Sequence, residues 1–139
     1  MKYIGLDYGA KSVGIALTDE TGTLARGVET VFRDSEKRLR KTLRRIEEII
    51  VESGAGALVV GLPLNMDGSE GERAEKARDF GQALARRTGL PVYYQDERLS
   101  TVEAGEILEL NGVNGRRERK ERIDNVAAAV ILEDYLNTL

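Results

Sequence analysis

The chain has 139 residues with no cysteine and no histidine, and its 21 basic and 24 acidic residues give a formal net charge of -3. This composition excludes disulfides, thiolate nucleophiles, imidazole bases and the zinc sites that depend on either residue type. Any enzymatic chemistry must therefore use Asp, Glu, Lys or Tyr, or a hard metal ion held by carboxylates.

The length is typical of one domain, so we expect a single domain over residues 1–139. The longest apolar runs are only a few residues, far below the roughly 18 that span a bilayer. The start of the chain also lacks the apolar stretch of a signal peptide. We therefore expect a cytoplasmic protein that makes no membrane contact.

Three β-strands are predicted first, over residues 2–9, 11–18 and about 24–32. In the second segment apolar residues alternate with small or polar ones, which is typical of a strand with one buried face. Because the connections are short, we expect the three strands to pair antiparallel in sequence order.

A helix is predicted next, over about 35–53, with Asp34 or Ser35 as its cap and with Gly54 and Gly56 at its end. Its apolar residues recur at intervals of three and four and form one stripe, made of Leu39, Leu43, Ile46 and Ile50. This face should pack on the sheet.

A continuous apolar run over 57–61 predicts a buried parallel strand. It is followed by a loop over 62–68 and a helix over about 70–88, for which Ser69 and Glu72 form a predicted capping box. Gly89, directly after this helix, is expected to end it.

The last part of the chain predicts a strand over 91–95, a helix over 101–110, an exposed mobile loop over 111–119 and a final helix over 120–136. The resulting order, βββαβαβαα, is typical of the α/β class. We expect a five-stranded mixed β-sheet flanked by about four helices.

Basic residues are concentrated in two segments, 33–45 and 116–122. Such a local excess suits contact with phosphates, and it equally suits a solvated helix face. Charge alone favours solvated helix faces for both segments, and the second also fits either a flexible arm on nucleic acid or a loop that only aids solubility.

Acidic residues occur at three places in the sequence where a carboxylate could bind a ligand. Asp7 lies between glycines in an apolar strand, where a buried charge requires a metal ion or hydrogen bonds. Asp96 and Glu97 follow the last strand, at the edge where α/β sheets bind ligands. Because side chains alternate along an extended segment, the two should point to opposite faces, and only one is expected to enter a site. Asp124 begins the final helix, where it would also complement the helix dipole.

Each of these acids alone has a simpler structural explanation, as a turn cap, a surface ion pair or a dipole partner. Three carboxylates from separate elements can also converge on hard divalent cations. Such sites hydrolyse phosphodiesters without histidine or cysteine. The missing residue types are therefore ones that this chemistry does not need.

Four motifs follow one another over nearly the whole chain: GLDYGAKSVGIA at 5–16, VGLPLNMDGSE at 60–70, DERLST at 96–101 and IDNVAA at 123–128. Their order and spacing resemble those of the YqgF (RuvX) family. This bacterial family is described both as Holliday junction resolvases and as nucleases that process pre-16S rRNA. The resemblance implies a ribonuclease H-like fold.

The resemblance also implies a catalytic site in which Asp7 bridges the metal ions and Glu97 and Asp124 are further ligands. The implied cofactor is Mg²⁺ or Mn²⁺, with two ions bound. Related enzymes often carry a fourth acid where this chain has Ala127. Glu121 or Asp67 could take its place.

Three further motif residues suit substrate binding. Lys11 and Arg98 could each hold a backbone phosphate, and Asn65 could hydrogen-bond a phosphate or a sugar. The structural alternatives are a solvated lysine, an ion-paired arginine and a turn-forming asparagine.

The sequence and the resemblance together favour a metal-dependent nuclease that acts on structured nucleic acid. We expect it to process the 5′ end of pre-16S rRNA as a monomer or weak homodimer. The first alternative is a Holliday junction resolvase acting on four-way DNA, which requires two sites and hence a twofold dimer. A non-catalytic module that binds nucleic acid or a ribosomal partner is another. An actin-like or sugar-kinase-type ATPase also opens with a glycine-flanked Asp, but it needs two such domains.

Overall fold

The computed structural model describes residues 1–97 and 116–139, the side chains of 116–124 aside. Its strands and helices follow in the order β1 (Tyr3–Tyr8), β2 (Ser12–Thr18), β3 (Ala25–Phe32), α1 (Arg40–Ser53), β4 (Ala57–Leu62), α2 (Glu72–Thr88), β5 (Val92–Asp96) and α4 (Arg116–Leu136). The predicted helix over 101–110 lies outside the described residues.

The five strands form one mixed sheet in the order β3-β2-β1-β4-β5. Strands β1, β2 and β3 pair antiparallel, whereas β4 pairs parallel with both β1 and β5. The expected mixed α/β architecture is confirmed. Because β1, β4 and β5 are parallel, their carboxyl ends share one edge of the sheet.

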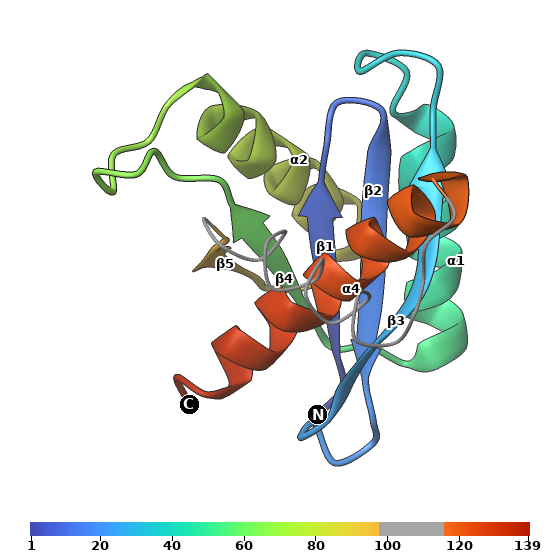
Figure 1. Cartoon of the computed structure of the whole chain (residues 1–139). Coiled ribbons are helices and arrows are strands. Elements are labelled where there is room, and N and C mark those ends of the chain that lie inside the picture. Colours follow the sequence, from blue (N-terminus) through green and yellow to red (C-terminus); the bar gives the residue numbers. More distant parts are fainter. Residues whose placement is uncertain (98–115) are drawn as a thin grey trace.

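Helices cover both faces of this sheet (Figure 1). Helices α1 and α2 pack on one face, where the main apolar core includes Ile4, Leu6 and Ile46. Helix α4 crosses the other face and buries Ile131 and Leu132 against Val59 and Ala16. None of the described helices is long and apolar enough to cross a membrane.

The sheet allows α4 to approach closely because it presents glycines along the helix's path. A Cβ on Gly5 would lie 3.0 Å from the carbonyl oxygen of Ala128, and one on Gly27 would lie 2.8 Å from that of Asn125. Gly61 on β4 faces Ile131 in the same way. The helix backbone therefore lies nearly against the strands.

The predicted start of the first helix was wrong. Helix α1 begins at Arg40 with Leu39 as its N-cap, and no side chain caps it. The preceding residues form a turn in which the amide of Arg38 donates to the carbonyl of Ser35. Glu36, in this turn, binds basic residues of α2, and this tertiary contact outweighs the local capping signal.

The capping box predicted for the second helix was also wrong, because α2 begins at Glu72 with Gly71 as its N-cap. The hydroxyl of Ser69 donates to Asp67 at 2.6 Å and so serves the loop instead. Both predicted stops are confirmed at Gly54 and Gly89, which adopt the left-handed conformation, whereas Gly56 does not.

The final helix begins earlier than predicted, at Arg116 instead of about residue 120. Residues 116–119 are therefore helical, and their prediction as a loop was wrong. The segment consists of Arg and Glu, which are good helix formers, so charge does not prevent it from extending the helix. Asp124 consequently does not lie in the first helical turn.

Candidate active site

Asp7 lies near the carboxyl end of β1, on the sheet face that α4 covers. Side chains alternate along a strand, and Leu6 and Tyr8 enter the core under α1 and α2. The side chain of Asp7 therefore points to the opposite face, the one that α4 covers. Gly5 lies on this same face, where Ala128 of α4 packs over it. Opposite Asp7, β2 contributes Gly14, which has no side chain to fill the space.

Glu97 reaches the same place from the end of β5. Its amide donates to the carbonyl of Leu62 at 3.2 Å, which continues the pairing of β5 with β4 by one residue. Its carboxyl lies over Gly61, where a Cβ would meet Oε2 at 2.8 Å. Alternation directs the side chain of the preceding Asp96 toward the face of Tyr94, beneath α2.

The carboxyls of Asp7 and Glu97 are hydrogen-bonded to each other. Burial raises the pKa of Glu97 well above its ordinary range, and the charges of Asp7 and Asp96 raise it further. Arg73 opposes this shift only in part. The raised pKa favours the protonated form of Glu97 beside Asp7, a divalent cation can take the place of this proton, and the oxygen donors of the two acids suit a hard ion such as Mg²⁺.

The third predicted acid, Asp124, lies in α4, but its side chain is outside the part that the structure describes. The next residue, Asn125, packs on β3, where its amide donates to the hydroxyl of Thr30 at 3.4 Å. Position 127 holds a buried alanine. Helix α4 thus crosses the face that carries Asp7, and the role of Asp124 stays a prediction.

Of the two substitutes for a fourth acid, only Asp67 has a described side chain. Its carboxylate accepts hydrogen bonds from the amide and hydroxyl of Ser69 in an exposed loop. Within the described residues, no group of three or more acids is placed to hold a metal ion. Asp67 is therefore not brought to Asp7 and Glu97. Glu121 belongs to the undescribed side chains.

The predicted substrate-binding residues have different surroundings. Lys11 is exposed in the turn between β1 and β2. The side chain of Asn65 donates to Ser69 at 3.0 Å and stabilises its own loop, in keeping with the turn-forming alternative. Arg98 lies outside the described residues. The structure thus leaves Lys11 accessible near the end of β1.

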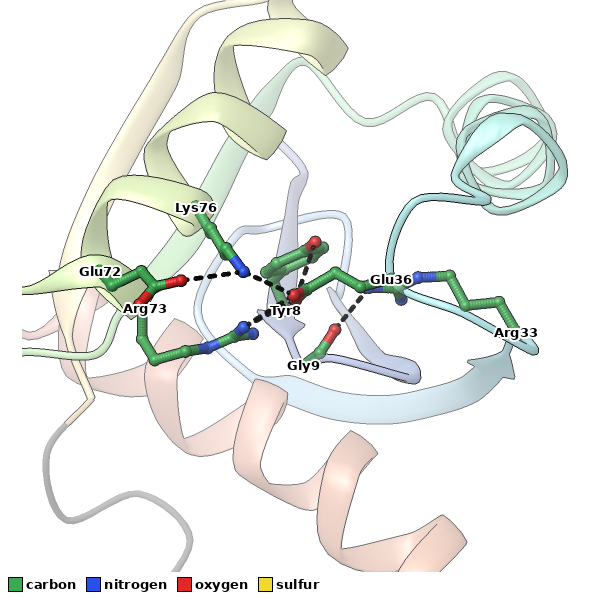
Figure 2. A network of polar contacts seen from close by, with 7 residues as sticks. All are labelled: Tyr8, Gly9, Arg33, Glu36, Glu72, Arg73 and Lys76. Atoms are coloured by element: carbon green, nitrogen blue, oxygen red, sulfur yellow. Dashed lines mark hydrogen bonds and ion pairs between the residues drawn. The ribbon is translucent and has the colours of Figure 1, made fainter.

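Arg73, at the start of α2, is a cation near the acidic pair that the sequence did not reveal. Its guanidinium lies 2.7 Å from a carboxylate oxygen of Glu36 and 5.7 Å from the ring centre of Tyr8, the residue after Asp7 (Figure 2). It also lowers the pKa of Glu97. Only the packing of α2 beside β1 brings this cation to the acidic pair, so no local pattern could indicate it.

Comparisons with known proteins show which sequences this chain resembles. The family model described as "RuvX: Holliday junction resolvase" matches residues 1–138. A protein of Agathobacter rectalis, named as a candidate pre-16S rRNA nuclease, is 51% identical over 100% of this chain and 96% of its own length. One of Lachnospira eligens with the same name is 50% identical over 99% of this chain and 98% of its own.

Solved structures support the fold. The RuvC protein of T. thermophilus, in complex with a Holliday junction substrate, has a TM-score of 0.58 at 20% identity, covering 99% of this chain and 96% of its own. The fowlpox virus Holliday junction resolvase has a TM-score of 0.53 at 13% identity, covering 99% of each chain. The sheet and its helices therefore have the ribonuclease H-like arrangement of these resolvases.

Proposed function

The chain belongs to the RuvX family, and on this premise we propose that it is a divalent-metal-dependent nuclease whose catalytic acids are Asp7, Glu97 and Asp124. One observation supports the proposal: the carboxyls of Asp7, in β1, and Glu97, directly after β5, meet at the carboxyl edge of the sheet, where Glu97 lies over Gly61. Two acids placed this close repel each other when both are ionised, so the arrangement favours binding of a cation.

Asp7, Glu97 and Asp124 would hold the ions, which we expect to be two Mg²⁺ or Mn²⁺. Bound there, such ions activate water and stabilise the leaving oxygen of a phosphodiester. The chain's own residues prepare the site. Gly14 and Gly61 leave space around the carboxyls, and Arg73 balances part of their negative charge.

Substrate contacts are assigned to Lys11 and Arg98, each of which would hold a backbone phosphate. Asn65 would contribute through its loop. Aromatic residues make up only 5% of the chain, so rows of stacking platforms for unpaired bases are not expected. Recognition should instead depend on the shape and backbone of a structured nucleic acid.

We assign precursor 16S rRNA as the substrate, because the relatives that cover nearly all of this chain are named for it, and we expect the cut at its 5′ end. The second candidate is a four-way DNA junction, which the family description favours. A junction resolvase must present two active sites, so that reaction requires a twofold dimer. An RNA-processing enzyme can act as a monomer.

The test combines metal binding with cleavage. Isothermal titration should show Mn²⁺ binding to the wild type and none to Asp7→Asn. The wild type should then cut a labelled 16S precursor fragment only when Mg²⁺ or Mn²⁺ is present. Sedimentation at micromolar concentration should show a monomer or a weak dimer.

Two outcomes would redirect the assignment. A tight dimer that makes paired symmetric nicks in a four-way junction and leaves RNA intact would establish the second candidate. Metal binding without cleavage of either substrate would favour a non-catalytic module that retains the fold.

A further inference from the structure

A groove of about 490 Å³ lies where β3 leads into α1, within residues 31–42. Its apolar part includes Val31, Phe32 and Leu39, and half of the ring of Phe32 is exposed. Its charged part consists of five cations and one acid: Arg33, Lys37, Arg38, Arg40, Lys41 and Asp34. Five of the seven basic residues in the first basic segment therefore line a concave surface, where their charges act together.

The charges in this groove are not neutralised by the protein. Among the described residues, none of its five cations forms a salt bridge. Elsewhere on the same side of the sheet, cations are paired with glutamates, as Arg45 is with Glu29 and Arg78 is with Glu70. Four of the groove's five cations are exposed, so their positive field is available to an external anion, whereas the guanidinium of Arg33 is largely buried.

Helix α1 contributes cations to this field at its amino end, where the helix dipole makes positive charge unfavourable. Its first turn contains Arg40 and Lys41 and no acid, and no side chain caps it. Helix α2 has the opposite pattern, with Glu72 in its first turn and Arg86 in its last, as the helix dipole favours. Basic residues at the amino end of α1 do not serve helix stability, so a bound anion is the better explanation.

The groove begins beside the candidate active site. The guanidinium of Arg33 donates to the carbonyl of Gly9 at 2.6 Å (Figure 2). The backbone amide of Arg33 donates to the carbonyl of Lys11 at 2.8 Å. Gly9 follows Asp7 by two residues in the chain. The cations thus continue from Lys11, in the turn after β1, toward α1.

We propose that this groove binds backbone phosphates of the nucleic acid whose scissile bond lies at Asp7 and Glu97. The position of the bound strand rests on the proposed function, whereas the affinity for phosphodiesters rests on the groove alone. RNA and DNA backbones offer the same phosphate chemistry, and the experiment separates them.

The test measures binding in EDTA, where no divalent ion supports cleavage. The proteins are the wild type, Arg38→Ala/Lys41→Ala and a control of equal charge, Arg44→Ala/Arg86→Ala, whose residues are exposed outside the groove. The probes are a labelled RNA hairpin with a 5′ extension and a synthetic four-way DNA junction. Anisotropy titrations at 50 to 200 mM salt give the salt dependence of each affinity, and circular dichroism checks that the variants fold.

Loss of two phosphate contacts should flatten the slope of log affinity against log salt by about 1.4 to 1.8. The advantage of the wild type over the groove variant should then shrink about tenfold across this salt range. The probe with the larger change identifies RNA or DNA as the ligand. Slopes equal to those of the control with both probes would overturn the proposal.

Cleavage of the same probes by the wild type in Mg²⁺ is measured separately. Normal cleavage with unchanged salt slopes would reject the groove and keep the nuclease. Weakened binding without cleavage by the wild type would keep the groove and reject the nuclease.

Discussion

The sheet separates two layers whose side chains differ in size and charge. Toward α1 and α2 it presents large buried residues, such as Ile4, Leu6 and Ile15. Toward α4 it presents glycines and an alanine, and at the carboxyl edge of this face lie Asp7 and Glu97. The first layer buries apolar area for stability. The second gives up part of that packing to bring a helix and two acids close together.

The largest expected effect is on the apolar layer. Leu84 of α2 is fully buried there, so Leu84→Ala should lower the free energy of unfolding by about 2 to 5 kcal/mol through lost burial and a residual cavity. Urea denaturation measures this loss. The cleavage rate of the folded variant at low temperature should stay close to that of the wild type, because Leu84 belongs to the core and not to the acidic pair.

The matched control is Leu24→Ala, since Leu24 is 70% exposed. It should change the free energy of unfolding by less than about 0.5 kcal/mol. Equal effects of the two substitutions would contradict the division of roles between the layers.

Asp7→Asn tests the opposite layer. It should slow cleavage by more than about 100-fold, because changing groups that merely contact metal ligands already costs about 10 to 100-fold. That loss corresponds to at least about 2.7 kcal/mol of activation free energy. Single-turnover cleavage measures it, with Asp79→Asn on the exposed surface of α2 as the control.

The same variant should be as stable as the wild type, or more stable, when metal is absent. The folded-state pKa of Glu97 is raised, so the wild type loses stability as pH rises above the ordinary carboxyl pKa of about 4.5. Removing the charge at residue 7 relieves this repulsion, and the gain should grow with pH. A thermal midpoint well below that of the wild type, with normal cleavage, would reject the metal site.

Gly61→Ala probes the close packing of the α4 layer. The added Cβ would lie 2.6 Å from Ile131 Cδ1 and 2.8 Å from Glu97 Oε2, so both side chains must move. We expect a loss of about 1 to 3 kcal/mol in the free energy of unfolding, and slower cleavage because Glu97 is displaced. Urea denaturation and single-turnover cleavage are the two measurements.

Gly56→Ala is the control for that change, because its Cβ would lie 3.4 Å from the flexible side chain of Met1. It should leave cleavage unaltered. If Gly61→Ala behaves in the same way, the space over Gly61 has no role in placing the acid.

The smallest expected effect concerns the polar contacts at the rim of the apolar layer. Hydrogen bonds from Lys76 and Arg73 lower the pKa of Glu36 to about 2 (Figure 2). The ionised Glu36 therefore stabilises the folded state fully above the ordinary pKa of 4.5, and this stabilisation is lost as pH falls toward 2. Because both basic partners are partly exposed to solvent, which screens the charges, we expect these contacts to contribute about 1 kcal/mol to the free energy of unfolding.

Denaturation curves of the wild type and Glu36→Gln should differ at pH 7 and converge near pH 2. Glu20→Gln, in the exposed turn after β2, should match the wild type at both values. A difference between the wild type and Glu36→Gln that persists at low pH would show that the carboxylate charge is not its cause.

Much of the fold could be predicted from local patterns. Alternation in β2 and the apolar run of β4 identified the strands, because side chains repeat every two residues along a strand. Gly54 and Gly89 marked helix ends because glycine adopts the left-handed conformation without steric cost. Asp7, and the pair of acids after β5, were identified as candidates from their places on the strands.

Tertiary structure decided the rest, through groups far apart in the chain. The starts of α1 and α2 moved because Glu36 and Ser69 found partners other than the expected helix ends. The family resemblance implied Glu97, and the physical reason that it and not Asp96 meets Asp7 is the pairing of β5 with β4 and the open space at Gly61. Arg73 reached the acids through the packing of α2. A sequence pattern records the periodicity of one element, whereas these contacts depend on how separate elements meet.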